Sequence, residues 1–433
     1  MTENTLVKDD FIRAFSENAG EPKELTERRL ASWKLAGELD LPFVDKTKID
    51  RWNFTKFDTY QPFQTGVTEE NLPEKIQAIV DLENKQANYY IQIDQHPAKC
   101  VLSEELKAKG VILTDIFTAA KDYPELFEKY FMTNAVKTSE HKLTAFHAAL
   151  VNGGVFLYVP KNVVIEEPIQ AVFASDQTES PLINHVLLVA DDNSQVTYVE
   201  NYVSLHEEAS GIVNIVEEVI ALSNAKITFG AVDTLAKDVV SYVNRRGHIG
   251  SDSRIEWALG LMNDGDTINE NTTNLIGSGS SGDVKTVTVG RGKQIQNVTT
   301  RVTHYGQGST GTILSHGVMR DKATTIFNGI GHIKHGASKS DAQQESRVLM
   351  LSPKARGDAN PILLIDENDV VAGHAASVGR VDPVQMFYLM SRGISKHEAE
   401  RLIIHGFLDP VVRELPIEGV KVMLKDVIEG KVR

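Results

Sequence analysis

Cysteine is almost missing from this sequence, because Cys100 is the only one among 433 residues. A single thiol excludes an intramolecular disulfide framework and a metal cage built from thiolates alone. Long apolar runs are also missing, and stretches such as "VLLVA" fall far below the roughly 18 residues that a membrane helix needs. The opening "MTENTLVKDDFIRAF" has early acids and no apolar core, unlike a signal peptide. We therefore expect a cytoplasmic protein with no membrane partner.

Positive charge is in short supply as well. The chain has 45 Lys and Arg residues against 59 Asp and Glu residues, which gives a formal net charge of −14. Binding to nucleic acid independently of base sequence depends on neutralising phosphates, so this balance argues against a nucleic-acid partner. Basic stretches such as "NRRGH" are short and isolated.

Three regions of the chain have different patterns. Residues 1–140 mix helix and loop, and "DDFIRAFSENAG" and "KELTERRLASWKLAGEL" space their apolar residues as amphipathic helices do. Residues 141–380 alternate short β-branched runs with Gly, Asn, Asp and Ser, which is typical of strands and turns. Residues 381–433 return to helical spacing. We expect an N-terminal helical and small α/β region, a β core, and a C-terminal helical region.

The β-rich region repeats at a nearly constant interval. Comparable turn-to-strand transitions reach their first apolar residue at Ile227, Ile255, Val284 and Ile313, which are 28, 29 and 29 residues apart. Intermediate corners are expected at "VNRRGHIG", "NLIGSGS" and "NGIGHIKHG". A strand–corner–strand unit of steady length indicates a β-solenoid, whereas the loop lengths of a β-sandwich need not repeat. The pattern therefore favours a mainly β protein with a parallel β-helix over a sandwich.

Capping signals mark the C-terminal helices. Asp382 precedes Pro383 as a predicted N-cap, and Gly393 is expected to end the first helix. Ser395 is the predicted N-cap of a second helix, which we expect to stop at Gly406. Part of the apolar surface of these helices is expected to close the open end of the solenoid, whose last coil would otherwise expose strand edges.

Motifs for common enzymatic chemistry are incomplete. The stretches "GSGSSGD" and "GRGKQ" resemble a phosphate-binding loop, but Val287 and Gln294 occupy the positions that require Gly and Ser or Thr. We therefore interpret these stretches as solenoid corners. The stretch "KHEAER" has Arg401 where the helical zinc motif needs its second histidine. The histidines of "GHIKHG" would face opposite sides of a strand, which argues against a shared metal.

The remaining reactive side chains have simple interpretations. Adjacent acids such as Glu217 and Glu218 face opposite ways on a strand, so solvated charge is the expectation and no acid/base pair is evident. Cys100 falls in a helical-looking stretch with no nearby histidine in sequence, which favours a buried or inert thiol.

His374 stands out in "VVAGHAASVGRVD", among small residues and just before the predicted helices. It is either a hydrogen-bonded histidine that ends the last coil or a metal ligand at a partner interface. Gly373, Ala375 and Ala376 would allow another chain to approach closely, and neutral imidazole is a common metal ligand. One histidine cannot hold a metal alone, so the other ligands would come from another chain.

The segment "ESRVLMLSPKARGDANPILLIDENDVVAGHAASVGRVDPVQMFYLMSRGISKHEAERLIIHGFL" closely resembles the hallmark segment of the SufB/SufD family of iron–sulfur cluster assembly proteins. The β-rich middle and "LPFVDKTKIDRWNFTKFD" fit the family more loosely. The resemblance implies a right-handed parallel β-helix flanked by N-terminal and C-terminal helical regions. SufB-type scaffolds are expected to carry cysteines in the β-helix and near the final histidine motif. Here Ala372 and Gly373 precede His374, which is similar to the SufD-type subunit.

The resemblance also implies a function and its partners. The chain would be a non-enzymatic subunit that pairs with a SufB-type subunit and binds a SufC-type ATPase, with a homodimer as the alternative pairing. His374 resembles the SufD-type histidine at the pairing interface, where a transient iron–sulfur cluster would form. No cofactor is expected to be bound tightly by this chain alone. The segment that meets the ATPase matches Phe387, Tyr388, Arg392 and Gly393.

Two other functions stay open. A SufB-like scaffold would hold a cluster by itself, although Cys100 is the only thiol that this chain offers. A β-helix enzyme that acts on acidic polysaccharide would need a cationic cleft and an acid/base pair. The net charge of −14 counts against such an enzyme.

Overall fold

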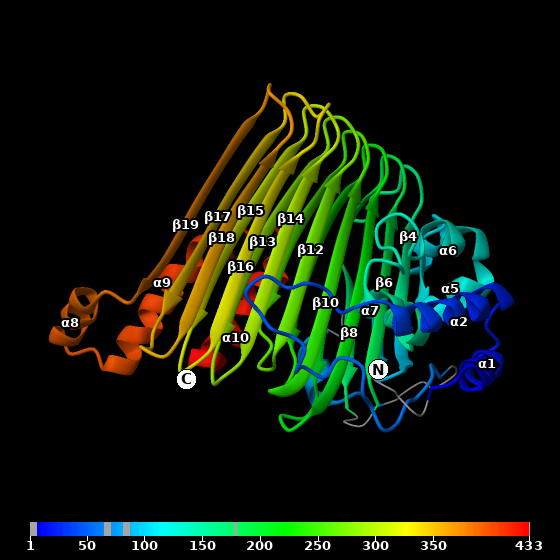
Figure 1. Ribbon diagram of the computed structural model, residues 1–433, viewed down its shortest axis with the longest axis horizontal. Helices are drawn as coiled ribbons and strands as arrows, with labels where there is room; N and C mark the ends of the chain where they lie inside the picture. The colour runs from blue at the N-terminus through cyan, green and yellow to red at the C-terminus, as the bar shows by residue number, and fades with distance from the viewer. Residues whose placement is uncertain (1–6, 65–70, 81–86, 177–179, 433) are drawn as a thin grey trace.

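The computed structural model describes residues 7–64, 71–80, 87–176 and 180–432. Its centre is a parallel β-solenoid of two sheets, with helices before and after it (Figure 1). The predicted fold class is therefore confirmed. The first six residues, on which part of the signal-peptide argument rests, lie outside the described residues. Within the described ranges, every helix is too short or too polar to cross a bilayer.

The two sheets take alternate strands of the chain. The first, called the odd sheet, has the order β19 (Val371–Arg380), β17 (Asp341–Met350), β15 (Thr310–Met319), β13 (Ser281–Gly290), β11 (Arg254–Leu261), β9 (Lys226–Thr234), β7 (Gln195–Ser204), β5 (Ile169–Ser175), β1 (Asn88–Ile93) and β2 (His96–Val101). The second, called the even sheet, has the order β18 (Arg356–Ile365), β16 (Thr324–Ile333), β14 (Ile295–His304), β12 (Thr267–Leu275), β10 (Asp238–Ile249), β8 (Ser210–Ala221), β6 (Leu182–Ala190), β4 (Gly153–Val159) and β3 (Ile112–Asp115). The pairs β1–β2 and β3–β4 are antiparallel, and the other paired strands are parallel.

The strand register follows the predicted repeat with one offset. Ile227 pairs with Ile255, and Val284 pairs with Ile313, as the spacing predicts. Ile255 pairs with Gly282 rather than with Val284, because the coil between them is two residues shorter than the spacing suggested. The predicted corner at "VNRRGHIG" is wrong, since these residues belong to β10.

One corner of the solenoid repeats the same backbone conformation from coil to coil. Asn162, Asn193, Asn224 and Asp252 each have a positive φ, between 56° and 65°, and Gly279 follows at 67°. Asn and Asp tolerate this left-handed conformation better than other side chains do, and glycine adopts it freely. The side-chain amides also form hydrogen bonds along the corner. Asn193 Nδ2 donates to Asn162 Oδ1, and Asn224 Nδ2 donates to Asn193 Oδ1, both at 3.0 Å.

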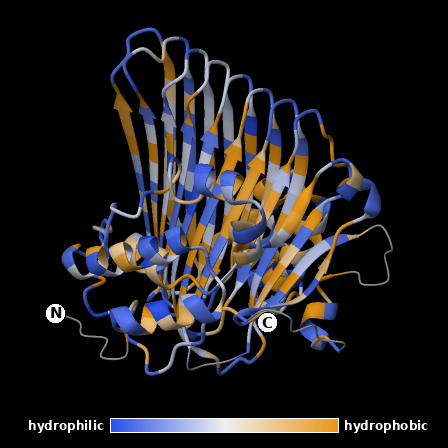
Figure 2. Ribbon diagram, turned by 90° about the vertical axis from the view of Figure 1, so that its right-hand side faces the viewer, coloured by the Kyte–Doolittle hydropathy of each residue, from blue (hydrophilic) through white to orange (hydrophobic). Residues whose placement is uncertain are grey.

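Apolar side chains fill the space between the two sheets. Residues in register on parallel strands point to the same face, so they stack in columns along the solenoid. In one such column, Tyr198 and Phe229 have ring centres 5.2 Å apart, and Phe229 and Trp257 have ring centres 4.9 Å apart. Figure 2 shows the hydrophobic bands along the strands and the hydrophilic loops at the upper corner.

A charged cluster is buried within this core. The Arg245 guanidinium on β10 lies 2.9 Å from Glu217, 3.1 Å from Asp233 and 3.3 Å from Glu200, and all four side chains are fully buried. Burial, and then the nearby Glu217, raise the pKa of Glu200 well above its ordinary value. The expectation of solvated charge is therefore wrong for Glu217 and Glu218, which are both buried on opposite faces of β8.

Most of the N-terminal helices cover the outer face of the even sheet at its first coils, shown at the right of Figure 1, whereas α3 packs against the odd sheet. Helices α1 and α2 confirm the amphipathic patterns of the sequence. The helices that precede the solenoid core are α1 (Asp9–Asn18), α2 (Lys23–Glu38), α3 (Glu74–Gln77), α4 (Glu104–Ala108), α5 (Ile116–Asp122), α6 (Pro124–Tyr130) and α7 (Lys142–Leu150).

The C-terminal helices are α8 (Pro383–Ser391), α9 (Lys396–Glu414) and α10 (Glu418–Val432). The predicted N-caps are confirmed, because Asp382 accepts a hydrogen bond from the Val384 amide at 2.8 Å and Ser395 accepts one from the Glu398 amide at 3.2 Å. The predicted end at Gly406 is wrong. Helix α9 continues past it because its apolar face, which includes the buried Leu408, stays packed on the solenoid.

The expectation that these helices close the open end of the solenoid is also wrong. Helices α9 and α10 pack on the outer face of the odd sheet, against residues of β7, β9, β11, β13 and β15. Gly230 makes room for α10, because a Cβ added there would come within 2.7 Å of Val420 Cγ2. Helix α8 and the last strand, β19, stay exposed as a result.

Replacing Arg245 with methionine removes the cation that three buried carboxyl groups share. We expect the free energy of unfolding to fall by about 3–5 kcal/mol, because a broken buried ion pair leaves an uncompensated charge. Urea unfolding measures this change. The control is Arg254→Met, an exposed residue paired with Glu256 on the surface, which should cost less than about 0.5 kcal/mol. Equal losses in both variants would contradict the structural importance of the cluster.

Candidate functional site

Strand β19 is the free edge of the odd sheet. It pairs with β17 on one side, and no strand of the described residues pairs with its other side. All of its residues except Gly373 are exposed. Val371 and Val378 favour the extended conformation, while small residues between them leave the backbone uncovered. Unpaired N–H and C=O groups along such an edge form a template for another strand.

His374 lies in the middle of this strand, and the register gives the direction of its side chain. It pairs with Gln344, which heads a column of buried residues that continues through Ile313, Val284, Trp257 and Phe229. Residues in one column share a face, so the imidazole faces the interior of the solenoid at its open mouth.

The residue beneath His374 leaves a polar atom unpaired. The side chain of Gln344 is buried, and its Nε2 donates to the Ile362 carbonyl at 3.0 Å. Its Oε1 has no hydrogen-bond partner among the described residues. A buried acceptor without a partner is costly, so the mouth of the solenoid combines an exposed imidazole with an unsatisfied acceptor.

The chain has few other groups that could hold a metal with His374. Across residues 7–64, 71–80, 87–176 and 180–432, no group of three or more His, Cys, Asp and Glu side chains is arranged to bind a metal ion. Cys100 lies on β2, at the opposite end of the odd sheet. Nine strand spacings separate the two strands, which corresponds to about 43 Å. Among the described residues, His374 therefore has no partner side chains with which it could complete a metal site.

The helix expected around Cys100 is wrong, because the residue lies on strand β2. Although the residue is exposed, its Sγ donates to the Leu113 carbonyl at 3.5 Å. Burial of the thiol, and then the nearby Asp115, raise its pKa to about 11. A thiol with such a pKa is a poor nucleophile and a poor metal ligand near neutral pH.

The four predicted partner-contact residues lie together on α8 and its final turn. No residue of α8 is buried, and Phe387 is 72% exposed. The Arg392 guanidinium lies 5.0 Å from the centre of the Tyr388 ring. Gly393 ends the helix with φ of 85°. Figure 1 shows α8 projecting beyond β19, so the helix offers an apolar face that the rest of the chain does not cover.

The structure does not place His374 beside these residues. Asp382, the N-cap of α8, lies eight positions after His374, which corresponds to about 26 Å of extended strand. The free edge and the exposed helix are therefore two neighbouring surfaces, joined by the end of β19.

Helix α9 is tied to the last coils by a buried histidine. His316 on β15 bonds through Nδ1 to the Phe407 carbonyl at 3.0 Å, and its Nε2 lies 3.5 Å from Glu345 on β17. The ring also packs on Phe407, with ring centres 5.1 Å apart. Burial lowers the pKa of His316, although the Phe407 carbonyl and Glu345 oppose the shift. Any displacement of α9 therefore acts directly on β15 and β17.

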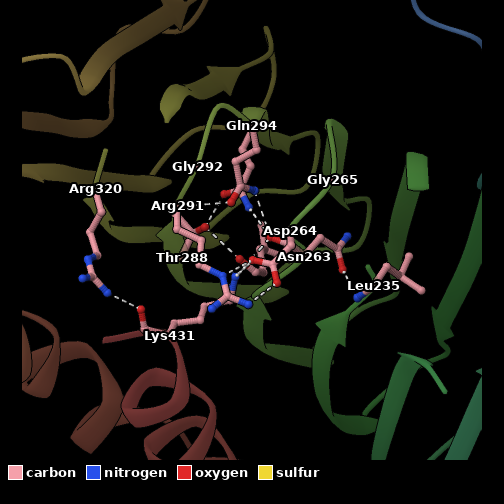
Figure 3. Close-up of polar contacts among 12 residues, drawn as sticks. Leu235, Asn263, Asp264, Gly265, Thr288, Arg291, Gly292, Gln294, Arg320 and Lys431 are labelled. Atoms are coloured by element: carbon pink, nitrogen blue, oxygen red, sulfur yellow. Dashed lines mark hydrogen bonds and ion pairs between the residues drawn. The ribbon is translucent and has the colours of Figure 1, made fainter. Parts of the chain in front are cut away.

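The last turn of α10 is fastened to two corners of the solenoid (Figure 3). Lys431 Nζ lies 2.6 Å from Asp264 Oδ1, and Arg291 lies 2.6 Å from the other oxygen of the same carboxylate. Arg320 donates to the Lys431 carbonyl. Burial lowers the pKa of Lys431, although Asp264 opposes the shift. Asp264, Arg291 and Lys431 border a hollow of about 1550 Å³, and their mutual pairing fixes the end of α10 at its edge.

Sequence reasoning missed Gln344 and the anchor of α10. The steady coil length carries a signal for Gln344, because it lies one coil before His374. No local pattern indicates the Lys431–Asp264 pair, which joins residues 167 positions apart.

Comparisons with known proteins cover almost the whole chain. A family model described as "SUF system FeS cluster assembly, SufBD core domain" matches residues 173–407, and one described as "SufBD protein N-terminal region" matches residues 47–171. An "Iron-sulfur cluster assembly protein SufD" of Bacillus subtilis is 60% identical over 99% of this chain and 98% of its own length. An "Iron-sulfur cluster assembly SufBD family protein" of Staphylococcus aureus is 27% identical over 95% of this chain and 90% of its own length.

The raised pKa of Cys100 predicts slow alkylation. At pH 8 we expect iodoacetamide to modify the native protein about 100-fold more slowly than the urea-unfolded chain, because the native thiol is rarely ionised. The rate of the native protein should keep rising up to about pH 11. The sequence has no second cysteine, so incorporation of label reports on this site alone. A rate that levels off below pH 9 would contradict the assignment.

Proposed function

Because the chain belongs to the SufBD family of iron–sulfur cluster assembly proteins, we propose that it is the SufD-type, non-enzymatic subunit of a cluster assembly scaffold. It pairs with a SufB-type subunit along β18 and β19 and binds a SufC-type ATPase through α8. The observation that carries this proposal is the free, exposed edge of β19, which leads directly into an exposed apolar helix.

The composition of the open end supports pairing with a second solenoid. Both sheets stop there, at β18 and β19, so a partner strand could extend each parallel ladder. Ile365 and Val378 are about two-fifths exposed, and Val371 is 60% exposed. Water leaves this apolar surface when another coil covers it, which favours association. Small residues such as Gly373 allow the partner backbone to approach.

The position of His374 supports a shared metal site at this junction. Its neutral imidazole can bind iron through one ring nitrogen. Thiolates are the usual ligands of iron–sulfur clusters, and the thiol of this chain lies at the far end of the odd sheet. In the proposed complex the SufB-type subunit supplies the thiolates, His374 supplies one nitrogen, and the cluster is cargo that later leaves.

The attachment of α8 supports coupling between the ATPase and the junction. Helix α8 follows β19 directly at Asp382 and continues into α9 through a short turn at Gly393. Helix α9 contacts β15 and β17 through His316, whereas α10 is held by Lys431. A force on α8 would therefore displace β19 and the last coils rather than the C-terminal end of α10. Nucleotide-driven movement of the ATPase would in this way reshape the cluster site.

Replacing His374 with alanine tests the shared site. Co-expression with SufB-type and SufC-type partners, followed by purification on a tag of this chain, should still recover the complex. Bound iron and sulfide should fall at least about tenfold, since even loss of a group that only orients a ligand costs 10–100-fold. The matched control is Ser377→Ala on the same strand, which should keep the wild-type cluster content.

Other outcomes would contradict the proposal. Loss of the complex in His374→Ala would show that the residue holds the interface together instead of binding metal. A stable, stoichiometric cluster on the isolated chain would favour the SufB-like scaffold. A wild-type chain that recovers only a second copy of itself would favour the homodimer.

Replacing Phe387 with alanine tests the ATPase surface. We expect the affinity for the SufC-type ATPase to fall about 30-fold or more, because a large aromatic side chain at the centre of an interface is a common hot spot. Titration calorimetry with the purified ATPase measures the loss. The control is Phe43→Ala, which removes another exposed phenylalanine (88% exposed) far from α8 in sequence. Equal losses in the two variants, or no loss in either, would place the ATPase elsewhere.

A further inference from the structure

A row of buried polar side chains joins the N-terminal helices to the solenoid. It runs from Glu218 on β8 to His185 on β6, then to His147 on α7 and back to Asn214 on β8. Glu218 Oε2 lies 3.2 Å from His185 Nε2, His185 Nδ1 lies 3.0 Å from His147 Nε2, and His147 Nδ1 lies 3.0 Å from Asn214 Oδ1. All four side chains are buried.

A backbone carbonyl sets the direction of every hydrogen bond in this row. Asn214 Nδ2 donates to the Leu143 carbonyl at 3.2 Å, which can only accept, so Asn214 Oδ1 must face His147. His147 Nδ1 therefore carries hydrogen, and its Nε2 accepts when the ring is neutral. The hydrogen between the two rings then sits on His185 Nδ1.

This order of hydrogen bonds leaves His185 Nε2 without a hydrogen-bond donor among the described residues. A neutral His185 carries no hydrogen on Nε2, and this buried nitrogen has no hydrogen-bond partner among the described residues, although Glu218 Oε2 lies 3.2 Å away. An ionised Glu218 would place negative charge beside the Nε2 lone pair, whereas a proton on either group removes this repulsion. We infer that Glu218 and His185 hold one shared proton, which locks the N-terminal helices onto the solenoid.

The surroundings of Glu218 fit a held proton. Its two oxygens accept from the amides of Met132 at 2.5 Å and Val136 at 3.1 Å, in the segment between α6 and α7. Burial raises the pKa of Glu218 to about 8, although these amides and the nearby cations oppose the shift. Burial also lowers the pKa of His185 to about 3, so the proton belongs mainly to the carboxyl group.

The other charged groups near the row come from three elements. Helix α2 contributes Arg28, which donates to the Met132 carbonyl at 2.7 Å and faces Glu128 on α6. Strand β10 contributes Arg246, which is paired with Glu140 at 2.6 Å, and His248, whose pKa burial lowers. Arg28 and Arg246 favour the ionised form of Glu218, but burial outweighs both, so neither replaces the shared proton.

Arg29 faces the other end of the row. It is fully buried, pairs with Glu21 at 2.6 Å and disfavours a positive charge on His147. Burial and the neighbouring His185 lower the pKa of His147 well below its ordinary value. The row is therefore neutral overall when it holds the shared proton.

Loss of this proton cannot be repaired by turning the rings over. If His185 takes the other tautomer to donate to an ionised Glu218, His147 must also change, and its Nδ1 lone pair then meets Asn214 Oδ1. If the Asn214 amide is turned over, its Nδ2 can donate to His147, but its Oδ1 then meets the Leu143 carbonyl, and both of these oxygens can only accept. One unmade bond and one buried charge remain in every arrangement, so the contact between the N-terminal helices and the solenoid weakens as pH rises.

The test compares urea unfolding of the full chain with that of Glu218→Gln from pH 6.5 to 9.5. In the wild type the folded state holds a proton that the unfolded glutamate has lost, so this contribution to stability falls from pH 6.5 to about pH 8 and is constant above that. The ratio of the wild-type to the variant unfolding constant should grow up to about tenfold per pH unit and level off above about pH 8. Glutamine has no titrating group, so the variant lacks this dependence; an amide nitrogen in the place of Oε2 also takes the acceptor from the Met132 amide, which lowers stability equally at every pH. Glu208→Gln, an exposed acid before β8, is the control and should follow the wild type.

A second measurement reads the row without unfolding the protein. Nitrogen-15 shifts of the histidine rings at pH 7 should show hydrogen on Nδ1 of His147 in both the wild type and Glu218→Gln. A ratio of unfolding constants that stays flat from pH 6.5 to 9.5 would overturn the shared proton. So would a His147 ring that carries its hydrogen on Nε2 alone.

Discussion

Each coil of this solenoid is held by backbone hydrogen bonds to the coils on either side, so the stack has to end in two unpaired edges. The chain treats its two ends differently. At the N-terminal end the sheets finish in antiparallel pairs, β1–β2 and β3–β4, next to a large helical layer. At the C-terminal end β18 and β19 finish with a free edge. The two ends of the solenoid therefore differ in both strand direction and helical cover.

The same ladder decides what each side chain does, because in-register residues share a face along the whole rod. Glu217 and Glu218 are neighbours in sequence, yet one meets Arg245 inside the solenoid and the other meets His185 at the helical layer. In both places the chain buries acids together with the groups that neutralise them, either a guanidinium or a proton. The Arg245 cluster favours one strand register within the solenoid, and the Glu218–His185–His147 row favours one position of the N-terminal helices on it.

The C-terminal helices pack along the side of the solenoid and do not cover its open end. Helices α9 and α10 are fixed along the side of the odd sheet, through His316 and Lys431, while α8 projects past the last strand. A lid over the lumen would have satisfied the strand edges of β18 and β19 within one chain. Packing on the side instead leaves those edges and His374 exposed.

The amino-acid pattern alone predicted a β-solenoid with helices at both ends, since a repeat of near-constant length and helix caps such as Asp382 are local signals. It also singled out His374 and the exposed residues of α8. It failed where distant segments meet. Gly406 predicted a helix end, but α9 continues past it because it packs on the odd sheet. Glu217 was expected to be solvated, but it pairs with Arg245 on the next coil. The burial of Gln344, the anchor of Lys431 and the proton row at Glu218 likewise join residues far apart in sequence, and only the folded stack of coils brings those groups within bonding distance.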